Sequence, residues 1–206
     1  MAKKQDLLKE ICFAHYKCGM HPKMNYHQLL QSEYYDEVFE MYKKLGGTLS
    51  EVPVRVGAYD IDTRNFIIEL DEENHFNRYR LATLDSTIYL ENKNIDVSKY
   101  RVFCNQYENK CCTHGKYWEN PSTQRMFGGS SVDGNFGIDA PSRWKQRAFY
   151  DFIKDVISIV LGIPILRISI YDQYKGYTIE SLIKGGSENA LIEYIDERLK
   201  NLKYNV

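Results

Sequence analysis

The chain has 206 residues, of which 43% are hydrophobic and 27% are charged, the balance of a single globular domain that buries a full core without disulfides or metals. Lys and Arg number 27 against 28 Asp and Glu, for a net charge of −1, which excludes a polybasic protein that coats nucleic acid. No apolar run is long enough to span a bilayer and no cleavable leader is visible, so we expect a cytoplasmic protein with reduced cysteines and no membrane partner.

The first third of the chain changes from a helical to a strand pattern. Apolar residues recur at helical spacing over 5–16 and again over 25–45. Residues 48–71 are rich in Val, Ile, Phe and Tyr and carry short polar breaks, which predicts three short strands. The last break predicts a hairpin between arms at 58–61 and 66–70.

The last third of the chain returns to long apolar patterns. A helix is predicted over 142–161, a buried strand over 163–171 and two more helices over 178–203. We expect Arg167, on the buried strand, to pair with an acid rather than to contact substrate. The less regular stretch at about 78–145 is interpreted as an insertion into one α/β domain that comprises the whole chain.

Carboxylates alternate with apolar residues on both arms of the predicted hairpin. Glu69 and Asp71 are two residues apart and therefore project from one face, and Asp60 or Asp62 on the other arm can lie across from them. Converging carboxylates repel one another without a cation, and oxygen ligands of this kind suit Mg²⁺ or Mn²⁺. The spacing also allows a plainer interpretation, in which these acids are solvated residues of a strand edge.

An ordered set of residues surrounds this hairpin. In chain order it comprises Glu33, Asp60, the segment Ile68-Glu69-Leu70-Asp71, His75, Asp151, the pair Lys154-Asp155, Gly162, and the segment Ile165-Leu166-Arg167-Ile168. This order resembles the PD-(D/E)XK restriction-endonuclease-like superfamily, nearest the branch related to the very-short-patch repair endonucleases. The chain departs from that branch at Glu72, which stands in place of a Gly, and at Lys154, which replaces an Arg. Asp71 stands where the wider superfamily carries Lys.

The resemblance implies a fold and an activity. The fold is an α/β restriction-endonuclease-like core of a helix, a three-strand meander, a helix and a strand, with a long insertion and C-terminal helices. The activity is hydrolysis of DNA phosphodiester bonds by a Mg²⁺-dependent endonuclease in restriction, repair or defence, either as a homodimer or with a partner protein of such a system. The alternative is a catalytically inactive nuclease-fold subunit that binds nucleic acid or assembles with other proteins.

The resemblance also implies roles for individual residues. Asp60, Glu69 and Asp71 would hold one or two Mg²⁺ or Mn²⁺ ions, and Glu33 would be an additional acid for the metal. His75 would act as a general base or orient a water, and Lys154 would stabilise charge on the phosphate. Without the resemblance, the plainer interpretations are a surface histidine that caps the next helix and a solvated lysine.

The insertion carries a second group of ligand-type side chains. It consists of Cys104, Cys111, Cys112 and His114. Thiolates and an imidazole this close in sequence could bind Zn²⁺. The alternative is the helix predicted at 96–109 followed by a loop with buried thiols, and a cysteine nucleophile is a third interpretation. The insertion also interleaves aromatic and basic residues, a composition that can stack on bases and bind phosphates.

Overall fold

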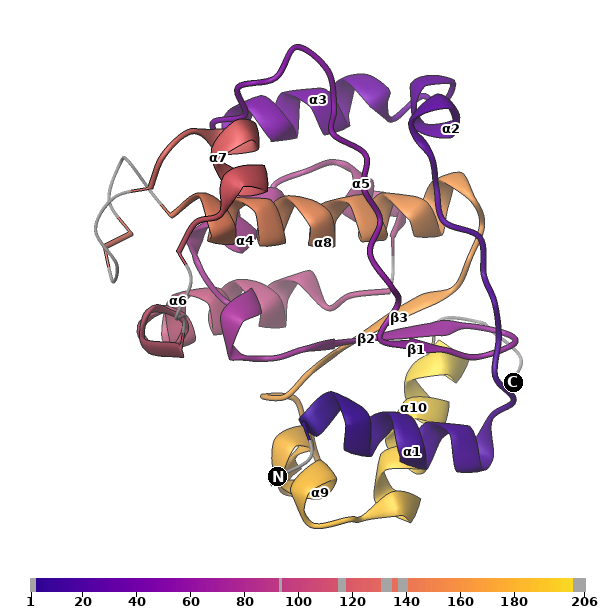
Figure 1. Cartoon of the computed structure of the whole chain (residues 1–206). Helices are drawn as coiled ribbons and strands as arrows, with labels where there is room; N and C mark the ends of the chain where they lie inside the picture. The colour runs from indigo at the N-terminus through magenta and orange to yellow at the C-terminus, as the bar shows by residue number, and fades with distance from the viewer. Residues whose placement is uncertain (1–2, 93, 115–117, 131–134, 137–140, 202–206) are drawn as a thin grey trace.

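The chain has a mixed α/β fold, as the sequence predicts (Figure 1). The structure, a computed structural model, describes residues 3–92, 94–114, 118–130, 135–136 and 141–201. Among these residues no helix is both long enough and apolar enough to cross a bilayer.

A small mixed sheet lies at the centre of the fold. Its strand order is β1 (Ile61–Asp62), β2 (Ile67–Asp71) and β3 (Ile165–Ser169), with β1 antiparallel and β3 parallel to β2. Every residue of β2 and β3 is buried, as expected for strands that are covered on both faces. A separate two-stranded sheet joins β4 (Gln173–Tyr174) to β5 (Tyr177–Thr178).

Helix α8 (Ser142–Val160) covers one face of the sheet (Figure 1). Buried apolar residues recur along it at spacings of three and four, which places a continuous apolar stripe against the core. The helix ends at Val160 with Leu161 as its C-cap, and Gly162 follows with a φ of 63°, a left-handed conformation that favours glycine. The other face of the sheet is covered by α1 (Lys4–His15), α9 (Ile179–Lys184) and α10 (Glu188–Asn201).

The stretch predicted as an insertion contains packed helices among its described residues. It contains α4 (Arg78–Thr83), α5 (Ile88–Glu91), α6 (Val97–His114) and α7 (Pro121–Phe127), and α4 and α7 both pack against α8. The predicted helix at 96–109 is therefore confirmed and longer than expected. Helix α7 begins at a capping box between Asn120 and Thr123.

The predicted helix over 25–45 is interrupted. It consists of α2 (Tyr26–Leu30) and α3 (Tyr35–Lys44), separated by a turn. Ser32 causes the break locally, because its hydroxyl donates to the carbonyl of Leu29 at 2.7 Å and accepts from the N–H of Tyr34 at 3.3 Å. Helix α3 lies on the side of α8 that faces away from the sheet (Figure 1).

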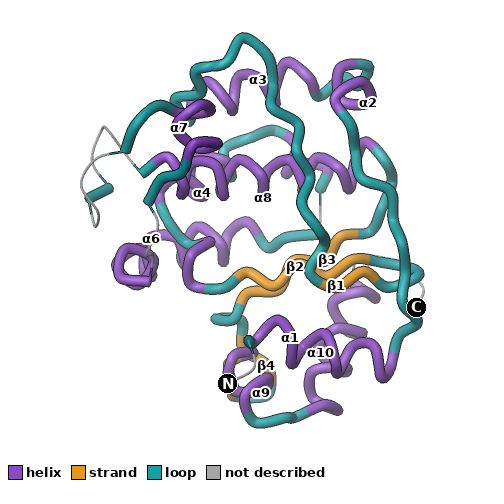
Figure 2. The backbone as a smooth tube through the Cα atoms, viewed as in Figure 1, coloured by secondary structure: helices purple, strands orange, loops and turns teal. Residues whose placement is uncertain are grey.

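The predicted three-strand meander is wrong in its first strand. Residues 48–60 form no strand and run as a loop across α8 (Figure 2). Pro53 has no N–H for a sheet hydrogen bond, and the N–H of Val54 turns back to the carbonyl of Val52 at 2.9 Å. The hairpin itself is confirmed, since Ile61 pairs with Ile68 and Asp62 with Ile67.

Candidate functional site

The hairpin brings Asp60 and Glu69 together. Asp60 immediately precedes β1, and the pairing of Ile61 with Ile68 places it across from Glu69. One carboxylate oxygen of Asp60 accepts the N–H of Leu70 at 2.9 Å, and the other accepts the side-chain amide of Gln5 at 3.1 Å. Both contacts hold the carboxylate of Asp60 beside β2.

Lys154 reaches this pair of acids from α8. Its Nζ lies 2.6 Å from Oε2 of Glu69 and 3.3 Å from the carbonyl of Ala58. The Lys154 side chain is only 13% exposed, so the interpretation of a solvated helix position is wrong. The position of Lys154 next to two acids of the hairpin could not be inferred from local sequence, because 85 residues separate it from Glu69.

Glu69 keeps one carboxylate oxygen without a partner. The residue is 3% exposed, and its Oε1 is buried with no hydrogen-bond donor among the described residues. Burial raises the pKa of Glu69 to about 7, although the charge of Lys154 lowers it and that of Asp60 raises it further. A buried oxygen without a donor is costly, and this one is available to a cation.

A second group of ligand-type atoms lies next along the chain. The short 3-10 helix η1 (Glu73–His75) follows β2 and returns His75 toward α8. Nδ1 of His75 lies 2.7 Å from Oδ2 of Asp151 and 3.2 Å from Oδ1 of Asp71. One atom from each of these three residues lies within 4.8 Å of the others, a spacing that could hold a metal ion.

These charges make His75 more basic. Burial lowers the pKa of His75, but the charges of Asp151 and Asp71 outweigh that effect and raise it. Nε2 of His75 has no hydrogen-bond partner among the described residues, and the side chain is 20% exposed. The interpretation of His75 as a cap of the next helix is wrong, because Asn77 caps α4.

A buried ionic network centred on Arg167 holds the two carboxylates that contact His75. Arg167 donates to Oδ1 of Asp71 at 2.7 Å, to Oδ1 of Asp155 at 2.5 Å and to the carbonyl of Asp151 at 2.8 Å. The hydroxyl of Tyr100 donates to Oδ2 of Asp71 at 2.7 Å. The expectation that Arg167 pairs with acids is confirmed, and both oxygens of Asp71 already have donors.

The two groups are adjacent but not equally open to a cation. Burial raises the pKa of Asp60; the charges of Lys154 and His75 lower it, and that of Asp71 raises it. Around Asp71, a dication would meet the guanidinium of Arg167 and displace an existing donor. Around Asp60 and Glu69, a cation would likewise meet the ammonium of Lys154 and the donors to Asp60, but the buried Oε1 of Glu69 has no donor among the described residues, so this half offers one free ligand atom.

Glu33 is not brought to these acids. It lies exposed in the turn between α2 and α3, and α3 lies on the side of α8 away from the sheet (Figure 1). Glu33 therefore does not join the acids of the hairpin in this structure, and its predicted role as a metal-binding acid has no support among the described residues.

The predicted zinc ligands do not converge among the described side chains. Cys104, Cys111 and Cys112 belong to α6 but to no group of three possible ligands in the described part of the chain, and the side chain of His114 lies outside it. Sγ of Cys111 instead accepts the indole N–H of Trp144 at 2.5 Å. Burial raises the pKa of both Cys104 and Cys111 to about 12, which favours the thiol over the thiolate that zinc requires.

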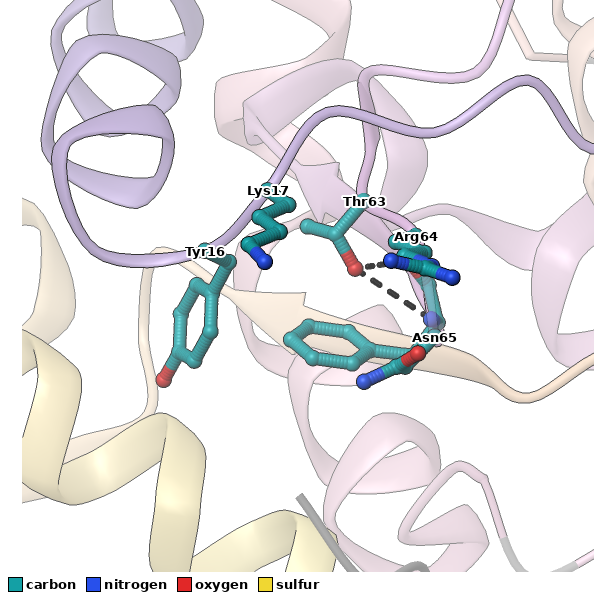
Figure 3. A pocket seen from close by; sticks show the side chains of 6 residues that line it. Tyr16, Lys17, Thr63, Arg64 and Asn65 are labelled. Carbon is teal, nitrogen blue, oxygen red and sulfur yellow. Dashed lines mark hydrogen bonds between the residues drawn. The ribbon is translucent and has the colours of Figure 1, made fainter.

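A hollow of about 420 Å³ lies at the turn of the hairpin (Figure 3). It is lined by Tyr16, Lys17, Thr63, Arg64, Asn65 and Phe66. The N–H of Arg64 donates to the carbonyl of Lys17 at 2.8 Å, so the segment after α1 lies against the hairpin turn. None of the acids at the other end of β2 lines this hollow.

The sequence did not identify the contributions of the insertion or of two arginines on α8. Tyr100 of α6 and Arg80 of α4 complete the ionic network, and nothing local in the sequence marks either residue. Arg143 and Arg147 lie on α8 before Asp151, and their spacing from Lys154 was a readable signal, because residues at intervals of three, four, seven and eleven share a helix face.

A family model with the description "Family of unknown function (DUF7255)" matches residues 40–185. The matched region contains both acids of the hairpin, His75, Asp151 and Lys154. No curated protein and no solved structure matches the chain.

Proposed function

The chain belongs to the DUF7255 family, and from the charged site within the matched region we propose that it is a metal-dependent nuclease that hydrolyses DNA phosphodiester bonds. We further propose that its core is of the restriction-endonuclease-like type. An antiparallel hairpin beside a parallel third strand, with two acids on β2 and α8 across the sheet, supports that assignment.

The observation that carries the proposal is the unpartnered Oε1 of Glu69. It lies in a group with a second acid, Asp60, and a lysine, Lys154. Carboxylate oxygens are the ligands that Mg²⁺ takes in proteins, usually together with waters and substrate phosphates. When bound, such an ion polarises a phosphoryl oxygen and favours an attacking hydroxide.

The other residues of the site have separate tasks. Lys154 neutralises Glu69 in the free protein and, from the same position, can contact a non-bridging phosphate oxygen and stabilise the charge that develops there. Asp151 holds Nδ1 of His75, which leaves Nε2 to orient a water or to give a proton to a leaving oxygen. Arg167 and Tyr100 fix the carboxylate of Asp71 and thereby the position of His75.

The test is a cleavage assay with matched acid variants. The full chain is incubated with plasmid, single-stranded DNA and RNA in Mg²⁺, Mn²⁺ or EDTA. We expect cleavage of DNA only with a divalent cation and a loss of at least about 100-fold in Asp60→Asn and Glu69→Gln. The control is Glu72→Gln, the first acid after β2, whose side chain is 36% exposed. Cleavage that survives in both site variants, or no cleavage of any polymer, refutes the proposal.

One observation favours a second candidate, an inactive nuclease-fold subunit that binds nucleic acid or assembles with other proteins. The acids already have partners within the chain: the charges of Lys154 and Arg167 offset those of Glu69 and Asp71, and the hydroxyl of Tyr100 donates to Asp71. Nucleic-acid binding without Mn²⁺ binding in calorimetry and without cleavage would favour this candidate. A homodimer or a partner protein from a repair or defence system stays a prediction, which light scattering and co-purification test.

A further inference from the structure

One face of α8 carries a line of basic side chains that leads to the proposed site. Its members are Arg143, Arg147 and Lys154; with Tyr150 between the last two, the four residues are spaced by three or four and therefore share that face. Lys154 contacts Glu69 at one end. Further along, the charge of Arg147 is close enough to His75 to oppose its protonation.

Two arginines from other elements join this line. Arg55 belongs to the loop at 48–60 and Arg125 to α7. Burial raises the pKa of Tyr150, and the charges of Arg55, Arg143 and Arg125 act on the same phenol in the opposite direction. The hydroxyl of Tyr150 lies 3.4 Å from Sδ of Met126, the neighbour of Arg125, which fixes α7 against this face. We call the four arginines the arginine strip.

The members of the arginine strip lack the carboxylate partners that five other arginines of the described chain have. In the described part of the chain no carboxylate lies within 4.0 Å of any of its four members, whereas carboxylates pair with Arg78, Arg80, Arg101, Arg167 and Arg198. Unpaired like charges repel one another, and burial together with the charge of Arg147 lowers the pKa of Arg143. A bound polyanion would relieve this repulsion.

We propose that the arginine strip binds successive phosphates of a nucleic-acid strand whose scissile phosphate lies at Lys154. Eleven residues of helix separate Arg143 from Lys154, a rise of about 16 Å, which matches about five nucleotides at 3.4 Å each. Guanidinium groups suit this task, because they bind phosphate oxygens in pairs and always carry charge. This inference rests on the proposed nuclease function for the position of the scissile phosphate, while its test uses binding alone.

The test measures binding in EDTA, where hydrolysis plays no part. Fluorescence anisotropy follows a labelled 20-nucleotide DNA strand, its duplex and the RNA of the same sequence over a series of salt concentrations. We expect Arg143→Gln/Arg147→Gln to weaken binding at least about 10-fold and to lower the slope of log K against log salt by about 2, roughly one unit for each phosphate contact. The matched control is Arg101→Gln on α6, whose partner is Asp85. This control should bind as the unchanged chain does.

Three outcomes overturn the inference: the double variant binds like the unchanged chain, the control weakens equally, or a poly-glutamate peptide of the same length binds as tightly as DNA. Arg143→Lys/Arg147→Lys separates charge from folding, because it should recover most of the affinity. If no polymer is cleaved but the variants change binding as expected, the proposed nuclease function is refuted while the proposed role of the arginine strip stands. If the chain cleaves DNA and the double variant still binds nucleic acid as tightly as the unchanged chain, only the proposed role of the arginine strip is refuted.

Discussion

Replacement of Asp155 by Asn should strongly destabilise the fold. Oδ2 of Asp155 accepts from Arg80 at 2.7 Å and from the hydroxyl of Tyr89 at 2.6 Å, and Oδ1 accepts from Arg167. Asp155 and both arginines are buried, and among the described residues Asp155 is the sole carboxylate within 4.0 Å of Arg80. Asn has the shape of Asp but removes the charge, and its amide group can accept only through one oxygen.

The size of the loss follows from this burial. Removal of one partner from a buried ion pair costs about 3–5 kcal/mol, because the remaining charge stays buried without compensation. A domain has a free energy of unfolding of about 5–15 kcal/mol, so a large part of the stability would be lost. With a urea dependence of about 2–3 kcal/mol/M for a chain of this size, the midpoint should fall by about 1–2 M.

Urea unfolding at pH 7, followed by circular dichroism and tryptophan fluorescence, measures this loss. The matched control is Asp85→Asn, because Asp85 also pairs with two cations, Lys44 at 2.9 Å and Arg101 at 2.8 Å, but has a side chain that is 49% exposed. The control should lose no more than about 1 kcal/mol. Equal losses for the two variants, or a loss below about 1 kcal/mol for Asp155→Asn, would refute the argument from burial.

Three further variants test other parts of the fold. Hydrogen bonds from Ser86 and Thr87 overcome the effect of burial and lower the pKa of Glu37, so Glu37 stabilises the fold above its unfolded pKa of about 4.5 and this contribution is lost as pH falls through the lower folded pKa. Acid titration of the unfolding free energy should therefore be shallower for Glu37→Gln. Gly19→Ala should cost about 1–3 kcal/mol, because a Cβ there would lie 2.0 Å from a backbone oxygen of the hairpin. Gly57→Ala, with open space around it, is the control, and equal urea midpoints would contradict the clash. Tyr100→Phe removes a donor from a buried carboxylate and should cost about 1.5–3 kcal/mol in the same assay; an unchanged midpoint would mean that this hydrogen bond contributes nothing.

The elements that the sequence predicted well are those with a local cause. The hairpin follows from a polar break between two apolar arms, and α8 follows from apolar residues at helical spacing. The two errors in the predicted elements also have local causes, which the surrounding apolar pattern outweighed in the prediction. Pro53 prevents the first strand of the meander, and the Ser32 hydroxyl divides the helix that had been expected to carry Glu33.

The sequence by itself determined the mixed α/β class, the two arms of the hairpin and the placement of Glu69 and Asp71 on one strand, because these depend on side-chain periods of two and 3.6. The tertiary structure alone decided that Lys154 neutralises Glu69 and that Arg167 and Tyr100 hold Asp71. These partners come from elements 29 to 96 residues away in the chain. Their meeting depends on how α6, α8 and β3 pack around β2, and packing over such separations leaves no periodic signal in the sequence.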